Sequence, residues 1–412
     1  MEPYFIYLNN LANRNRKQFE QYPALQWMNS SRAINAQKKK DNLSAQLSRI
    51  FKDTKPYHNQ LSEGCRLCGT GTWSCLFITN KCNAKCFYCP SAQTNDEIPA
   101  TQSLTFSSPE SYAAYINHFG FKGVSFSGGE PLLFFERTLE YLRAIRKHCQ
   151  PDIYIWMYTN GILATEEKFR QLAEAGLNEV RFDIGATGYR LDKLKHAKGI
   201  IPNITIEIPA VPERKDLLKQ LLPEMVEAGV TNLNLHQLRL TKYNVLKLVK
   251  HNYTYIQAEQ PVVLESELTA LEIIKTAGEN HSNIGINYCS FYYKNRYQSS
   301  GFRKILAKAS NVPEDKITER GYIRYYNGQS IGYTAMVLTE LYETNTQLQK
   351  LELADKTCGI KIETAMPTIQ LTSDQKAEVD RLLCKEPVHI PSEEYLFKIW
   401  QMEYIEKGIC EY

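Results

Sequence analysis

Short apolar runs, separated by polar stretches with helical periodicity, dominate the middle of the chain. Seven of these runs are rich in β-branched or aromatic residues and are bounded by Gly, Asn or Asp, which is typical of buried strands. They are SCLFIT (74–79), GVSFS (123–127), DIYIWMYT (152–159), EVRFDI (179–184), ITIEI (204–208), NLNLHQ (232–237) and NIGINY (283–288). The pattern therefore predicts seven strands between residues 74 and 288.

Helices are predicted between the strands. In SSPESYAAYINHF (107–119), Ser108 can cap the first turn and Pro109 can occupy the first helical position. In TEEKFRQLAEAGL (165–177), Thr165 precedes two acidic residues and Gly176 ends the last turn. Alternating strands and helices imply right-handed crossovers and a mainly parallel sheet. We therefore predict an α/β fold with an open or closed barrel over about residues 74–288.

The pattern changes before and after the barrel. Residues 1–64 are polar and predict a helical segment followed by a linker, whereas residues 65–300 hold a cysteine-rich entry and the barrel. Residues 301–412 are irregular and predict an α+β appendage, with a hairpin at RGYIRYYNG (320–328) and a helix at TSDQKAEVDRLLCK (372–385). The chain is thus predicted to have three parts.

Charge and hydropathy restrict the class of protein. The 412 residues carry a net charge of +4, which is too small to argue for nucleic acid or a membrane surface by itself. The N-terminus has no apolar segment behind a basic start, and no run of about 18 apolar residues occurs. We expect a cytoplasmic protein with no membrane partner.

Six of the eleven cysteines lie within residues 65–91, and three of them, Cys82, Cys86 and Cys89, follow the first predicted strand with C-x3-C-x2-C spacing. In a reducing cytosol, clustered thiols are more often metal ligands than disulfides. Three thiolates on a tight loop can hold three irons of a 4Fe-4S cube and leave the fourth iron open. A structural zinc site would need a fourth ligand from elsewhere in the chain.

This loop, with Tyr88 before its last cysteine, resembles the signature of radical S-adenosylmethionine (SAM) enzymes. Further motifs follow in the order of that family: GVSFSGGEP (123–131), MYTNG (157–161), VRFDIG (180–185), IEIPAVP (206–212) and NLNLHQL (232–238). The resemblance covers about residues 65–300. The motifs CRLC, LFIT, KCN and CFYCP are similar to a branch of this family related to pyruvate formate-lyase activating enzymes.

The resemblance implies a partial (β/α)6-type barrel in which SAM binds the open iron and the GGE turn meets its amino group. It also implies an electron donor such as flavodoxin or ferredoxin. The residues that it places near SAM are Tyr88, Gly128, Gly129, Glu130, Asn160, Asp183 and Glu207, with His236 as a further candidate. The polar residues among them also suit an ordinary role in turns and caps.

A second group of cysteines flanks the barrel sequence. Cys65 and Cys68 form a C-x2-C pair, Cys75 lies within the first predicted strand, and Cys289 follows the last. Because barrel closure brings the first and last strands together, Cys65, Cys68 and Cys289 are predicted to hold a second iron–sulfur cluster or a zinc ion. Cys75 is a fourth candidate ligand, although strand alternation can also turn it into the core.

Three functions agree with these features. The first is a radical SAM enzyme that abstracts hydrogen from a peptide, an RNA or a small metabolite. The second is an activase that installs a glycyl radical on a partner protein. The third is an iron–sulfur protein that only transfers electrons, against which the GGE turn argues, because an electron carrier does not need to bind SAM.

Overall fold

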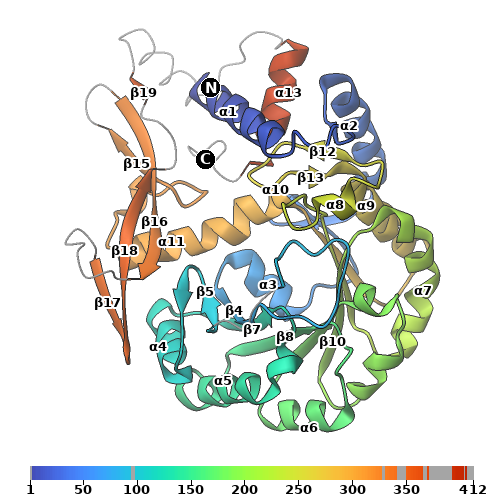
Figure 1. Ribbon diagram of the computed structural model, residues 1–412, viewed down its shortest axis with the longest axis vertical. Helices are drawn as coiled ribbons and strands as arrows, with labels where there is room; N and C mark the ends of the chain where they lie inside the picture. Colours follow the sequence, from blue (N-terminus) through green and yellow to red (C-terminus); the bar gives the residue numbers. More distant parts are fainter. Residues whose placement is uncertain are drawn as a thin grey trace.

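The computed structural model describes residues 2–93, 98–326, 330–340, 349–364, 369–370, 392–402 and 404–405. A large, mainly parallel sheet curves into a partly open barrel at its centre (Figure 1). The strand order of this sheet is β2-β3-β14-β11-β10-β9-β8-β7-β4-β5-β6. The helix predicted over residues 372–385 lies outside the described residues.

The seven predicted strands are present and form the parallel part of this sheet. They are β4 (Trp73–Thr79), β7 (Gly123–Gly128), β8 (Tyr154–Thr159), β9 (Glu179–Phe182), β10 (Asn203–Pro209), β11 (Asn232–His236) and β14 (Gly285–Cys289). Apolar residues such as Val124, Ile155 and Ile206 are fully buried in these strands. The predicted α/β class with a mainly parallel barrel sheet is therefore confirmed.

Helices cover the outer face of the barrel (Figure 1). They are α4 (Pro109–Phe119), α5 (Phe135–His148), α6 (Glu166–Glu174), α7 (Lys215–Glu227) and α9 (Leu264–Glu279), with the short α8 (Val245–Leu248) near the rim. The predicted caps are confirmed, because the side chain of Ser108 accepts from the Ser111 N–H and that of Thr165 accepts from the Lys168 N–H.

The N-terminal segment contributes both helices and strands. Helices α1 (Glu2–Gln18) and α2 (Ser30–Ser44) precede β2 (Ser48–Ile50) and β3 (Lys55–His58), and β3 pairs antiparallel with β14. The predicted linker thus contains two strands that extend the main sheet beyond its last parallel strand. A short helix, α3 (Glu63–Thr70), then packs against β4, β7 and β8 inside the barrel.

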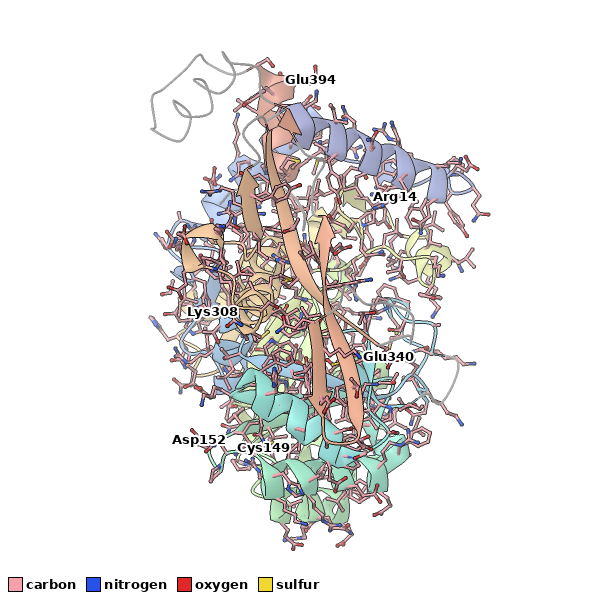
Figure 2. The ribbon with its side chains drawn as sticks, turned by 90° about the vertical axis from the view of Figure 1, so that its left-hand side faces the viewer. Arg14, Cys149, Asp152, Lys308, Glu340 and Glu394 are labelled. Atoms are coloured by element: carbon pink, nitrogen blue, oxygen red, sulfur yellow. The ribbon has the colours of Figure 1, made fainter. Side chains whose placement is uncertain are left out.

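The C-terminal part forms an antiparallel sheet on one side of the barrel. Its order is β15 (Ile323–Tyr326), β16 (Ser330–Glu340), β18 (Lys356–Thr364) and β17 (Gln349–Leu353), with β19 (Ile369–Gln370) paired to β16. Figure 2 views this sheet from outside, with Glu340 near one end. The Glu340 carboxylate accepts from the Thr105 N–H at 2.8 Å, which connects the sheet to the barrel edge.

The remaining elements link these parts. Strand β15 pairs antiparallel with β16, as the predicted hairpin requires. The other strands and α-helices are β1 (Gln26–Trp27), β5 (Ala100–Thr101), β6 (Leu104–Thr105), β12 (Thr254–Ile256), β13 (Val262–Val263), α10 (Phe291–Tyr293), α11 (Ser299–Ala309) and α13 (Glu393–Met402), and a π-helix at Lys294–Gln298 joins α10 to α11. Within the described ranges, no helix is long and apolar enough to cross a membrane.

Candidate functional site

A cavity of about 1090 Å³ lies at the carboxyl ends of the barrel strands. Ligand sites in α/β folds usually occupy this edge of the sheet. Of the residues predicted to form the site, the following line the cavity: Cys75, Cys82, Cys86, Tyr88, Cys89, Gly128, Gly129, Asn160, Asp183, Glu207 and His236. The folded chain thus brings residues from six strand ends to one chamber.

The loop after β4 carries Cys82, Cys86 and Cys89 at the wall of this cavity. The sulfur of Cys82 accepts hydrogen bonds from the Ala84 N–H at 3.4 Å and from the Asn160 side-chain amide at 3.6 Å. Burial raises the pKa of Cys86 to about 12, so this group is a thiol at neutral pH unless a cation is nearby. A coordinated metal deprotonates such a thiol, and thiolates are the donors that iron–sulfur clusters require.

The GGE turn holds the cysteine loop through the backbone. The Gly129 N–H donates to the Thr79 carbonyl at 2.7 Å, and the Glu130 N–H donates to the Lys81 carbonyl at 2.9 Å. Gly128 has φ of +121°, and a Cβ atom on Gly129 would lie 2.0 Å from the Lys81 carbonyl oxygen. Glycine is therefore required at both positions, because the turn and the loop are in direct backbone contact.

The Glu130 side chain lies behind the turn and is fully buried. Its carboxylate accepts from the Leu132 N–H at 3.0 Å, the Thr159 hydroxyl at 2.8 Å and the Asn160 N–H at 2.7 Å. Burial raises the pKa of Glu130 to about 7, although these three hydrogen bonds oppose the shift. The geometry makes Glu130 a tie between the ends of β7 and β8, and the cavity wall at this point consists of Gly128, Gly129 and Pro131.

Tyr88 and Asp183 join the cysteine loop to the end of β9. The Tyr88 hydroxyl donates to Asp183 at 2.7 Å, and the Gly185 N–H donates to the same carboxylate oxygen at 3.0 Å. Burial raises the pKa of Asp183 to about 6 against these hydrogen bonds. The pair fixes the loop close to a polar group that remains able to accept further hydrogen bonds from a ligand.

A chain of charged side chains crosses the floor of the cavity. The buried guanidinium of Arg181 pairs with Glu179 at 2.9 Å and with Glu207 at 2.6 Å. Burial opposes the charge of Glu207, but Arg181 and His236 outweigh it and hold the pKa of this carboxyl well below its usual range. His236 accordingly contacts Glu207 with one ring nitrogen and Lys294 with the other, the latter at 3.3 Å.

The second cysteine group surrounds a buried lysine between α3 and β14. The Lys55 ammonium donates to the Cys289 sulfur at 2.8 Å and lies 4.3 Å from the centre of the Tyr293 ring. Despite burial, the charges of Cys289, Cys65 and Cys68 keep the pKa of Lys55 above its ordinary value. The side chain of Gln298 donates to the Cys68 sulfur at 2.9 Å. Sequence reasoning did not find Lys55, because lysine in a short strand is usually exposed.

Cys75 lies apart from this group. It faces the cavity from β4, on the same strand face as Trp73 and Phe77. Burial raises the pKa of Cys75 to about 11, against hydrogen bonds with Ser125 and Ser127. In the described part of the chain, no three His, Cys, Asp or Glu side chains are grouped as the ligands of a single metal ion.

The open barrel carries its thiol loop at the carboxyl ends of the strands, where α/β-barrel enzymes have their active sites. Residues 76–208 match the model of the family described as the radical SAM superfamily. The match places this segment, about a third of the chain, in the radical SAM superfamily, whose members are enzymes that use a 4Fe-4S cluster and SAM.

Several curated proteins share parts of the sequence. A protein of Methanocaldococcus jannaschii, named as a candidate glycyl-radical enzyme activating enzyme, is 29% identical over 68% of this chain and 78% of its own. The GTP 3′,8-cyclase of Staphylococcus carnosus is 32% identical over 27% of this chain and 33% of its own. The chain therefore spans most of the archaeal relative but only about a third of the cyclase.

Solved structures with similar elements are more distant. SuiB of Streptococcus suis bound to the precursor peptide SuiA is 14% identical, with a TM-score of 0.37, and the match covers 56% of this chain and 53% of SuiB. The structure titled anSMEcpe with bound AdoMet and a Cp18Cys peptide is 19% identical, with a TM-score of 0.31, over 39% of this chain and 50% of its own. The chain thus spans about half of each of these proteins.

Proposed function

We propose that this protein reductively cleaves SAM at a 4Fe-4S cluster held by Cys82, Cys86 and Cys89, and that it abstracts hydrogen from a substrate in the adjoining cavity. With both cofactors bound, the cluster would pass one electron from a flavodoxin or ferredoxin to SAM, which would break the sulfur–C5′ bond, release methionine and yield 5′-deoxyadenosine with a hydrogen atom taken from the substrate. The observation that carries the proposal is the backbone contact between the thiol loop and the GGE turn at the cavity wall.

The residues of the chain position the reactants in this proposal. Backbone groups of Gly128 and Gly129 face the cavity, where no side chain prevents close approach of a ligand. Asn160 and Asp183 place an amide and a carboxylate at neighbouring strand ends, where each can bind the amino or hydroxyl groups of SAM. Glu130 acts by positioning, because it ties the Asn160 backbone to the turn.

The cavity has room for a substrate beside SAM. Its volume of about 1090 Å³ exceeds the range of roughly 300–1,000 Å³ that is usual for the site of one small ligand. Strand β16 closes one side with Ala335, Met336 and Val337, and helix α11 adds Phe302. Walls from the C-terminal part favour an enclosed substrate, because they exclude water from a reactive radical.

The proposal also includes a second metal centre, which Cys65, Cys68 and Cys289 would bind. A buried ammonium is costly unless an anion accompanies it, and the groups around Lys55 are these thiols. Metal-bound thiolates supply that negative charge, either in an iron–sulfur cluster or at zinc. Metal analysis after replacement of Cys82, Cys86 and Cys89 by alanine tests this centre, since about four irons or one zinc should remain per chain.

Glycyl-radical activation is the second candidate function, and the name of the archaeal relative favours it. Its substrate would be the backbone of a partner protein, which has to reach the cavity as an extended loop. The walls contributed by β16 and α11 favour an enclosed small substrate instead. Mixing the reduced, SAM-loaded protein with a glycyl-radical enzyme and recording the radical by electron paramagnetic resonance separates the two.

Formation of 5′-deoxyadenosine tests the main proposal. The anaerobically reconstituted protein, incubated with dithionite and SAM, should release this product, and replacement of Cys82, Cys86 and Cys89 by alanine should abolish it. Release of an equal amount by the triple variant would reject the assignment of the cluster ligands.

A further inference from the structure

Two cations share one aromatic ring on the cavity wall. The guanidinium carbon of Arg239 lies 5.7 Å from the centre of the Phe291 ring, and the ammonium nitrogen of Lys294 lies 5.2 Å from it. Arg239 follows β11, whereas Phe291 and Lys294 follow β14, and all three line the cavity. Neighbouring strands thus deliver two positive charges to one small area.

Neither cation forms a salt bridge with a carboxylate within the described residues, although the charge of Glu207 acts on Lys294. The polar contact of the Lys294 ammonium is the Nδ1 atom of His236 at 3.3 Å, and the contact of the Arg239 guanidinium is the Phe291 ring. Arg181, on the floor of the same cavity, has two carboxylates. The chain therefore gives the buried Arg181 two salt bridges and leaves two half-buried cations without one at the cavity.

The two charges repel each other. Burial lowers the pKa of Lys294, and the positive charge of Arg239 lowers it further, whereas Cys289, Cys68 and Glu207 oppose the shift. Burial also lowers the pKa of Arg239, and the charge of Cys89 opposes that shift. Like charges that are half-buried next to each other are costly unless an anion accompanies them. A ligand with a negative group between these side chains would relieve that cost and gain two charge-assisted hydrogen bonds.

We propose that Arg239 and Lys294 bind an anionic group of the substrate, a carboxylate or a phosphate, and that Phe291 packs against its apolar part. The substrate is then a small anionic molecule. Attribution of the anion to the substrate rests on the proposed function, in which SAM lies at the GGE turn. That turn ends β7, which β8, β9 and β10 separate from β11 in the sheet.

Anion binding is measurable without the substrate and without turnover. Inorganic phosphate and succinate, each compared with chloride at equal ionic strength, should raise the melting temperature of the reconstituted full-length protein, and the concentration dependence gives a dissociation constant for each. The tighter of the two indicates whether the natural group is a phosphate or a carboxylate. Arg239→Gln and Lys294→Gln should each weaken this binding about tenfold or more.

Matched variants keep the test specific. Lys242→Gln removes an exposed cation three residues beyond Arg239 that does not line the cavity, and it should leave anion binding unchanged. Arg239→Lys keeps the charge and should retain part of the binding. SAM affinity, measured on the same variants, should remain within about twofold of wild type. Wild type that binds the anions but does not cleave SAM would count against the proposed function and not against the anion site.

Two results would overturn the inference. One is a melting temperature that phosphate and succinate raise no more than chloride does. The other is an Arg239→Gln or Lys294→Gln variant that binds the anions normally but loses SAM affinity, because that result would assign the cations to SAM.

Discussion

The Lys55 ammonium lies 2.8 Å from the Cys289 sulfur and thereby connects the strand β3 of the N-terminal segment to the last parallel strand of the barrel. The lysine is only 1% exposed. Its charge suits a neighbouring group of metal-bound thiolates, which would carry the opposite charge. The contact therefore leads to a direct test of the second metal centre.

Lys55→Met should weaken metal binding at Cys65, Cys68 and Cys289 about 10- to 100-fold, since the variant removes the hydrogen bond to a ligand and the compensating charge. The measurement is the amount of iron and zinc that each chain retains as a chelator is titrated in. The protein used also carries alanine at Cys82, Cys86 and Cys89. Lys52→Met is the control, because Lys52 is exposed and pairs with Glu319. Equal metal retention by both lysine variants would contradict the role of Lys55.

Gly129→Ala should reduce the iron bound by the first cysteine loop as well as SAM affinity. The new Cβ would lie 2.0 Å from the Lys81 carbonyl oxygen, so the loop that carries Cys82 has to move. Iron content and the visible absorbance of the reconstituted protein report this change. Gly120→Ala provides the comparison, because Gly120 has φ of +64° but no atom within 4 Å of its added Cβ. Wild-type iron content in Gly129→Ala would show that the turn does not support the loop.

Stability should depend on the ionisation of Glu130. Burial raises the pKa of this carboxyl from 4.5 to about 7, so the folded protein holds a proton that the unfolded chain releases. The stability contributed by this group therefore falls as the pH rises from about 4.5 to about 7. Because Glu130→Gln does not titrate, the wild type's advantage in free energy of unfolding over this variant should shrink across that window.

Urea unfolding at about pH 5.5 and about pH 8 measures the effect. At the lower pH, Glu130→Gln should be less stable than wild type by about 1–3 kcal/mol. In the variant, the side-chain NH2 group would face the Asn160 N–H, and two donors cannot form a hydrogen bond with each other. Glu140→Gln, at an exposed position of α5, should follow the wild type at both pH values. A difference between wild type and Glu130→Gln that is independent of pH would contradict the shifted pKa.

The barrel could be predicted because its signals are local. Strand β10 has alternating Ile204, Ile206 and Ile208 in seven residues, and the caps at Ser108 and Thr165 lie within three residues of the N–H groups that they bind. The C-x3-C-x2-C loop follows its strand directly. Such patterns need no knowledge of distant parts of the chain.

The rest depends on contacts between distant residues. Strand β3 reads KPYH, and its buried Lys55 is explained only by thiols and an aromatic ring at other positions, including Cys289 and Tyr293. Glu130 could be identified from the GGE motif, but the φ of +121° at Gly128 and the donors Thr159 and Asn160 decide that it lies behind the turn. The pairing of Arg239 and Lys294 likewise depends on β11 and β14 being neighbours.

The most direct test of the proposed function is the yield of 5′-deoxyadenosine from SAM. Reconstituted wild type and a Cys149→Ala control, which changes a half-buried thiol outside the loop, should both form it under anaerobic conditions with dithionite. The variant with alanine at Cys82, Cys86 and Cys89 should form none above the level without protein. An equal yield from this variant, or no product from wild type that contains a complete 4Fe-4S cluster, would contradict SAM cleavage at this site.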